Sequence, residues 1–151
     1  MSSMLDRKAV LYGIDAADKN DVLYRMAEAL KEAGKIEDVD AFYKDVQARE
    51  QIAPTAIGFD MGLPHGKTDN VMEAGIAFAK MSSPVVWNPE TGEEAKVAIM
   101  LAVPEKEAGN THLDLLAKLS RRLIHEDFRN ELLNSDADRA YDLLTETLEE
   151  K

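Results

Sequence analysis

Apolar residues recur at helical spacing in two segments of the first third of the chain. Asp18 and Asp21 resemble a capping box with aspartate in the glutamate position, and apolar residues follow every three or four positions up to Gly34. A second helix is predicted to begin near Asp38, and the next position of its apolar stripe is Arg49. This guanidinium either snorkels past the edge of the core or points into a site that binds an anion.

The middle of the chain has the pattern of strands. Between Ile52 and Gly66, prolines and glycines divide the sequence into short β-like pieces, so a helix is not expected there. The apolar run from Val97 to Val103 is uninterrupted, which is typical of a central strand covered on both faces. Strands are predicted in three segments: 75–81, 85–87 and 96–103.

The last third of the chain returns to helical spacing. Asn110 or Thr111 is the predicted N-cap of a helix, and two further helices are expected over about residues 126–133 and 138–150. The apolar face of the first of these helices is predicted to consist of Leu113, Leu116, Ala117, Ser120, Leu123 and Ile124.

The order of these elements predicts the fold class. Helices come first, strands fill the middle and helices return, which favours an α/β fold with a sheet flanked by helices. Strict β-α-β alternation is missing, so the sheet is expected to be mixed parallel and antiparallel. No repeat, low-complexity tract or linker divides the sequence, and residues 1–151 are expected to form a single domain.

Charge and hydropathy exclude two classes of partner. The chain has 18 Lys+Arg against 29 Asp+Glu, a net charge of −11, whereas binding to nucleic acid needs a clustered basic face. The longest apolar run, Val97 to Val103, is far shorter than the roughly 20 residues that span a bilayer. Residues 1–8 lack the apolar stretch of a signal peptide, so we expect a cytoplasmic protein with no direct membrane insertion.

The residue types also limit the chemistry. Without cysteine, thiolate catalysis, cysteine-based zinc sites and iron–sulfur clusters are excluded, and the three histidines match no zinc spacing, so no metal is expected. Residues 62–68 resemble a phosphate-binding Walker loop at first sight. The spacing is one residue short, however, because Gly62 and Gly66 enclose three residues instead of four, and this argues against a nucleotide triphosphatase.

Two histidines are candidates for chemistry. Pro64 and Gly66 restrict the backbone on either side of His65, which is either a rigid, exposed imidazole or a turn histidine without a chemical role. His112 falls in the first turn of a predicted helix, where it is either merely solvated or placed beside a bound anion. Together with Arg49, these groups suit phosphoryl transfer.

Six segments then show, in order and spacing, a resemblance to a known family. The chain resembles the fructose/mannitol-type enzyme IIA of the bacterial sugar phosphotransferase system over about residues 18–147. The segments are Arg49-Glu50, Pro54-Thr55-Ala56-Ile57-Gly58, Leu63-Pro64-His65-Gly66-Lys67, Pro84-Val85-Val86-Trp87, Leu101-Ala102-Val103-Pro104 and Asn110-Thr111-His112-Leu113.

The resemblance implies a phosphocarrier. His65 would accept a phosphoryl group through Nε2 from the phosphohistidine of HPr and pass it to a cysteine of an enzyme IIB partner. His112 would be the second active-site histidine, Arg49 the arginine that contacts the phosphoryl group, and Thr55 a hydroxyl near the site. The resemblance implies no cofactor, and the transported sugar does not contact this domain in the family.

Two departures from the family pattern bear on the branch to which the chain belongs. Ala56 replaces a glycine, and Phe59-Asp60 replaces the usual Asn-Gly. Besides transport of fructose, mannitol or another polyol, the resemblance leaves open a nitrogen-type regulatory enzyme IIA, in which the phosphorylation state controls binding to partner proteins.

Overall fold

The fold was analysed in a computed structural model, which describes residues 4–106 and 110–149 and, for residues 110–113, the backbone alone. Five helices and six strands make up these residues. In chain order they are β1 (Leu5–Ile14), α1 (Lys19–Glu32), α2 (Val39–Ile52), β2 (Ala56–Gly58), β3 (Met61–Gly62), β4 (His65–Thr68), β5 (Gly75–Asn88), β6 (Glu93–Pro104), α3 (Asn110–Leu123), α4 (Glu126–Asn134) and α5 (Ala137–Leu148).

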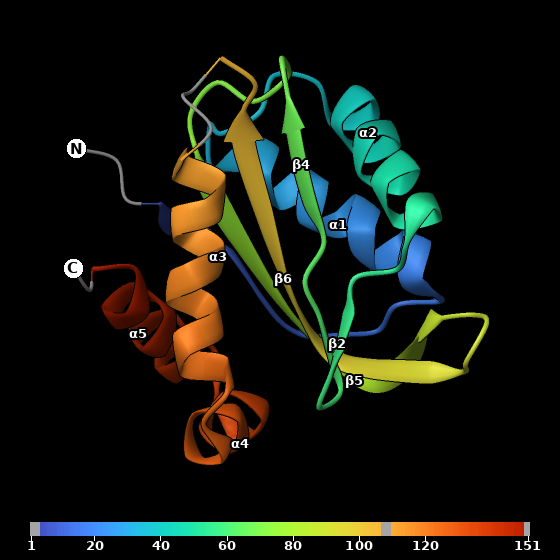
Figure 1. Cartoon of the computed structure of the whole chain (residues 1–151), viewed down its shortest axis with the longest axis vertical. Coiled ribbons are helices and arrows are strands. Elements are labelled where there is room, and N and C mark those ends of the chain that lie inside the picture. Colours follow the sequence, from blue (N-terminus) through green and yellow to red (C-terminus); the bar gives the residue numbers. More distant parts are fainter. Residues whose placement is uncertain (1–3, 107–109, 150–151) are drawn as a thin grey trace.

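All six strands form one mixed sheet, which confirms the predicted fold class. The strand order is β1-β5-β6-β3-β2, and β4 also pairs with β6. Strand β5 runs antiparallel to β6, and β2 runs antiparallel to β3. Strand β1 pairs in parallel with β5, and both β3 and β4 pair in parallel with β6. Helices α1 and α2 cover one face of the sheet, and α3 lies on the other with α4 and α5 beside it (Figure 1).

Two predicted helix starts and the predicted central strand are confirmed, whereas Asn110 and Thr111, the predicted N-cap candidates of α3, already lie inside that helix. Asp18 caps α1 by accepting a hydrogen bond from the backbone N–H of Asp21, and Asp38 caps α2 in the same way. In β6, every side chain from Val97 to Val103 is at most 2% exposed. The strand is therefore enclosed by helices on both faces, as its unbroken apolar run indicates.

The first strand was missed by the sequence prediction, which places helices first. In β1, only Leu5 and Ala9 are fully buried, and three charged residues lie between them. A strand at the edge of a sheet buries few side chains, so its sequence lacks the alternation that identifies a strand. The two strands predicted over 75–81 and 85–87 are one strand, β5, with an irregular register between Lys80 and Val85.

The predicted apolar face of α3 is also wrong in part. Of that face only Leu123 is buried, whereas Ile124 is 71% exposed and the side chain of Leu113 lies outside the described residues. The buried line of the helix instead contains Leu115 and Leu119. Leucines occupy two neighbouring lines of this helix, and packing against the sheet and α5 selects one of them.

None of the helices within residues 4–106 and 110–149 is long and apolar enough to cross a membrane.

The buried line of α3 can be tested by a matched pair of truncations. Leu119→Ala removes a side chain that is 0% exposed and is expected to lower the free energy of unfolding by about 2–5 kcal/mol. Ile124→Ala, at the exposed residue directly after α3, is expected to change it by less than about 0.5 kcal/mol. Urea denaturation measures both, and the opposite ranking would contradict the helix orientation.

Candidate functional site

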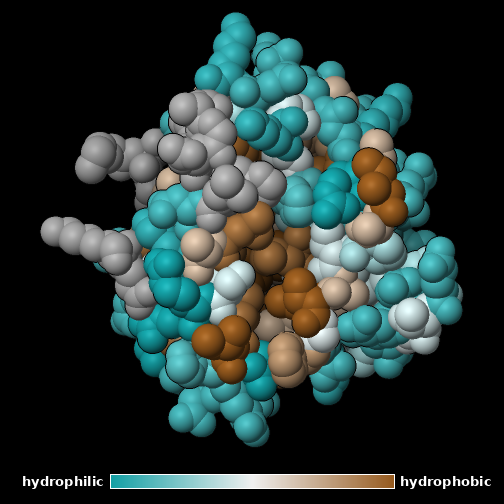
Figure 2. Space-filling view, viewed as in Figure 1, coloured by the Kyte–Doolittle hydropathy of each residue, from teal (hydrophilic) through white to brown (hydrophobic). Residues whose placement is uncertain are grey.

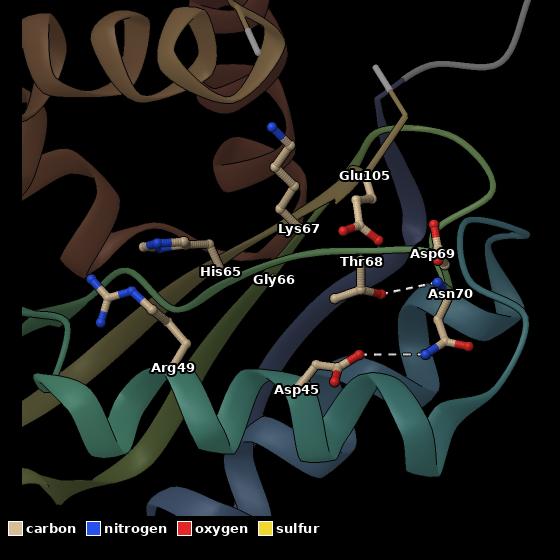
Figure 3. Close-up of a pocket in the computed structure, with 9 residues that line it drawn as sticks. All are labelled: Asp45, Arg49, His65, Gly66, Lys67, Thr68, Asp69, Asn70 and Glu105. Atoms are coloured by element: carbon tan, nitrogen blue, oxygen red, sulfur yellow. Dashed lines mark hydrogen bonds between the residues drawn. The ribbon is translucent and has the colours of Figure 1, made fainter. Parts of the chain in front are cut away.

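An open pocket of about 620 Å³ lies where β4 meets α2. It contains two of the residues that the sequence singles out, His65 and Arg49, and Figure 3 shows how their side chains enter it from two different elements. Its lining consists of Asp45, Arg49, His65, Gly66, Lys67, Thr68, Asp69, Asn70 and Glu105.

Strand pairing decides on which face of the sheet His65 lies. His65 is the first residue of β4 and pairs with Leu101 of β6. Gly66 faces α2 so closely that a Cβ atom there would come within 3.0 Å of Phe42. Because side chains alternate along a strand, His65 and Lys67 project from the other face, on the side of α3 (Figure 3).

A backbone carbonyl fixes the tautomer of His65. Its Nδ1 atom lies 3.2 Å from the carbonyl oxygen of Leu63. A carbonyl oxygen only accepts hydrogen bonds, so the proton of the neutral ring sits on Nδ1 and the lone pair on Nε2. Nε2 is therefore the basic nitrogen of the neutral ring.

The surroundings of His65 keep its ring neutral near pH 7. The ring is half-buried, and this burial lowers its pKa below the usual 6.5. The hydrogen bond to Leu63 raises the pKa, the positive charge of Arg49 lowers it, and the charge of Glu50 raises it, but desolvation outweighs these effects. A neutral imidazole retains the lone pair that a nucleophile needs.

Arg49 points into the pocket from the last turn of α2. Its side chain is partly buried, and Nη1 donates a hydrogen bond of 2.9 Å to the carbonyl oxygen of Ala53. Figure 3 shows the guanidinium beside the ring of His65. The guanidinium thus points into the pocket, as the anion-site alternative for this residue requires, and its fork matches the geometry of a phosphoryl group.

The far end of the pocket has the opposite charge. Asp69 and Glu105 lie together there, and their hydrogen bond, followed by the charge of Asp69, raises the pKa of Glu105. Lys67 projects between this acidic pair and His65 (Figure 3). A dianion is accordingly favoured at the end that holds Arg49 and repelled from the other.

The other two predicted site residues, His112 and Thr55, are not part of this pocket lining. His112 is in the first turn of α3, as the sequence predicts, but its side chain lies outside the described residues. Thr55 is buried, and its hydroxyl donates a hydrogen bond of 2.6 Å to Glu50. The structure therefore brings Arg49 and His65 together and places Thr55 behind them.

Two residues of the site were missed by sequence reasoning. Lys67 lies two positions from His65, so strand alternation alone places it on the same face. Glu50 is buried next to Arg49, and a second charge in the last turn of α2 was the signal for it. Within the described part of the chain, no three His, Cys, Asp or Glu side chains are grouped to hold a metal ion.

Comparison with protein families and curated proteins gives a consistent result. Residues 3–147 match the family described as "Phosphoenolpyruvate-dependent sugar phosphotransferase system, EIIA 2". The chain is 34% identical over 134 residues to the fructose-specific EIIA component of Haloferax volcanii, covering 88% of this chain and 86% of that protein. Larger multidomain relatives from Escherichia coli and Bacillus subtilis also match, and the chain spans only 16–22% of their length.

Solved structures share the fold. The nitrogen regulatory protein IIA-Ntr of Neisseria meningitidis superimposes with a TM-score of 0.84 at 23% identity, covering 93% of this chain and 96% of that one. The enzyme IIA of the mannitol system of E. coli, solved in complex with phosphorylated enzyme IIB, superimposes with a TM-score of 0.78 at 23% identity, covering 92% and 95%.

The protonation of His65 can be measured directly. In an NMR titration of the folded chain, the imidazole of His65 is expected to have a pKa below 6.5, and below that of the same residue in the urea-denatured chain. Arg49→Ala is expected to raise this pKa, because the guanidinium lowers it. A pKa above the denatured value would contradict the described environment.

The lowered pKa of His65 also determines how the free energy of unfolding depends on pH. Because the unfolded chain binds the proton more tightly, His65 reduces the free energy of unfolding as the pH falls from 6.5 through the lower folded pKa, and has no such effect above 6.5.

Proposed function

Because the chain belongs to the EIIA 2 family of the phosphoenolpyruvate-dependent sugar phosphotransferase system, we propose that it is a phosphocarrier for sugar uptake. In this proposal His65 receives a phosphoryl group from the phosphohistidine of HPr and passes it to a cysteine of an enzyme IIB. The observation that supports it best is the contact between Nδ1 of His65 and the Leu63 carbonyl, which presents Nε2 as a nucleophile beside Arg49.

The first transfer proceeds in line. Nε2 of His65 attacks the phosphorus, a phosphorus–nitrogen bond forms on His65, and the bond to the imidazole of HPr breaks with its electron pair returning to that ring. Arg49 stabilises the negative charge on the equatorial oxygens, and we assign His112 to the second donor, as the family resemblance implies. The positive charge of Arg49 is presented on a planar guanidinium group whose N–H groups can bind two of these oxygens.

The Leu63 carbonyl also prepares the second transfer. It accepts the hydrogen bond from Nδ1 and so favours a proton on that atom while Nε2 carries the phosphoryl group. When the thiolate of enzyme IIB attacks the phosphorus, the phosphorus–Nε2 bond breaks and His65 leaves as a neutral imidazole. A neutral leaving group is far better than an imidazolide anion, so the transfer needs no added proton.

The surface around His65 suits transient partners. Figure 2 shows apolar side chains gathered between α3 and strands β2 and β4, on the face from which His65 projects. Exposed apolar patches of this kind mark interaction sites in proteins that are otherwise polar on the surface. The mannitol enzyme IIA from E. coli was itself solved in complex with phosphorylated enzyme IIB. We propose that HPr and enzyme IIB dock in turn on this face.

Phosphorylation tests the proposal. Incubation with enzyme I, HPr and phosphoenolpyruvate is expected to give one acid-labile phosphoryl group per chain, which enzyme IIB then removes. His65→Ala is expected to take up none while keeping its circular dichroism spectrum. A wild-type chain that stays unmodified, or an adduct that persists in His65→Ala, would refute the assignment.

The charge-stabilising residues can be tested by rate. Arg49→Ala and His112→Ala are each expected to lower the transfer rate by about 10²–10³-fold with the fold intact, as the loss of one preorganised donor does at comparable sites. Arg49→Lys is expected to fall between wild type and alanine, because an ammonium supplies charge without the fork. Quenched-flow transfer from phosphorylated HPr measures these rates, and wild-type rates in both alanine variants would argue against the roles.

A further inference from the structure

Behind the pocket, Glu50 is part of a closed ring of hydrogen bonds among four residues. Its Oε1 accepts hydrogen bonds from Nζ of Lys19 at 2.7 Å and from the backbone N–H of Thr55 at 3.0 Å, and its Oε2 accepts the Thr55 hydroxyl at 2.6 Å. Trp87 completes the ring, because its Nε1 donates to the Thr55 hydroxyl at 3.3 Å and its carbonyl accepts from Lys19 at 2.8 Å. The ring joins α1, α2, the segment before β2, and β5.

Stability alone is a weak reason for this arrangement. The side chains of Glu50 and Lys19 are only 5% and 15% exposed, so both charges are largely removed from water. Replacing a buried ion pair by apolar groups of similar size is often neutral or stabilising, because the desolvation cost is then avoided. A buried pair is therefore more readily understood through what it holds in place.

The ring holds the arginine of the site. Arg49 precedes Glu50 in the last turn of α2, and its Nη1 donates to the carbonyl oxygen of Ala53. Ala53 lies between Glu50 and Thr55, the two residues that the carboxylate ties together. Fixing the chain between Glu50 and Thr55 thus fixes the carbonyl that orients the guanidinium.

The ring also holds the histidine. The carbonyl of Thr55 accepts a hydrogen bond of 2.9 Å from the backbone N–H of Leu63, and the carbonyl of Leu63 is the partner of His65 Nδ1. The indole of Trp87 packs on Gly62, where an added Cβ atom would come within 2.5 Å of the ring. Leu63, which orients His65, is therefore supported by Thr55 directly and by Trp87 through the neighbouring Gly62.

We propose that Glu50 is a positioning residue for phosphoryl transfer, which through Thr55 sets both the direction of the Arg49 guanidinium and the tautomer of His65. This inference rests on the proposed function for its rate effect. Lys19 neutralises the buried carboxylate, so a phosphoryl dianion can bind beside Arg49 without an uncompensated negative charge behind it. Thr55 acts in the same way, through its bond to Glu50, and does not contact the phosphoryl group.

Two substitutions test the ring. In Glu50→Gln the amide group meets donors only, since Lys19 and both polar groups of Thr55 donate to the carboxylate. Thr55→Val keeps the shape and removes the hydroxyl. Each is expected to slow transfer from phosphorylated HPr by about 10²-fold, the loss that a misplacement of about 1 Å causes in comparable sites. Thr55→Ser, which keeps the hydroxyl, is expected to recover most of the rate.

The tautomer of His65 separates positioning from stability, because a loss of stability alone does not change it. In the unphosphorylated wild type, ¹⁵N spectra of the imidazole are expected to show the proton on Nδ1, whereas both variants are expected to show a mixture of the two tautomers. Glu73→Gln serves as the matched control, because it breaks the ion pair of another buried lysine, Lys35, which is 2% exposed. It is expected to lower thermal stability and leave both rate and tautomer unchanged.

Folded Glu50→Gln and Thr55→Val proteins with the wild-type rate and a single Nδ1–H tautomer would overturn the inference. A loss of rate in Glu73→Gln that matches its loss of stability would overturn it too, since destabilisation would then explain the effect. If the wild-type chain accepts no phosphoryl group, the proposed function fails, while the tautomer spectra of the same variants still decide whether Glu50 positions His65.

Discussion

Strand β6 hydrogen-bonds to β5 along one side and to β3 and β4 along the other, and the last of these pairings determines where the chemistry can occur. From Val97 to Val103 its side chains are buried on both faces, so a shift of register would expose part of the core. His65 pairs with Leu101, and the preceding carbonyl of Pro64 accepts from the N–H of Leu101 at 3.0 Å. His65, the proposed phosphoryl acceptor, is thus placed by pairing with the buried central strand.

The groups that surround His65 come from a helix terminus and a loop and not from the centre of the sheet. Arg49 lies on the last turn of a helix and Leu63 on a short connection between β3 and β4. The chain that follows Arg49 is held by the bonds between Glu50 and Thr55, and Leu63 is held by its bond to the Thr55 carbonyl, so both positions depend on the buried ring around Glu50. In the proposed site, the strand that carries His65 is accordingly combined with polar supports from α1, α2, β5 and the segment before β2, as preorganised electrostatic sites require.

The turn between β2 and β3 shows how this chain tolerates a departure from the family pattern. Phe59 and Asp60 both have positive φ angles, 59° and 62°, where glycine and asparagine are the ordinary choices. The guanidinium of Arg129 stacks 3.7 Å above the Phe59 ring, and the Asp60 carbonyl accepts from the Lys96 N–H at 2.7 Å. These contacts offset the backbone strain and tie the turn to α4 and β6.

Local patterns in the sequence were sufficient for the features that depend on neighbours along the chain. Both aspartate caps, the buried central strand, and the motifs of Arg49 and His65 depend on spacings of a few residues, which capping and periodicity express directly. The mixed parallel and antiparallel sheet could also be predicted, because strands that follow one another without a helix between them pair antiparallel.

Only the tertiary structure decided the rest, since it depends on contacts between distant segments. Edge strand β1 has a sequence pattern too weak to identify it, and α3 has two lines of leucines between which only packing chooses. The tautomer of His65 depends on one carbonyl, whose place is set by a ring that joins residues 19, 50, 55 and 87. No local spacing encodes such a ring, because its members meet only once the helices have packed on the sheet.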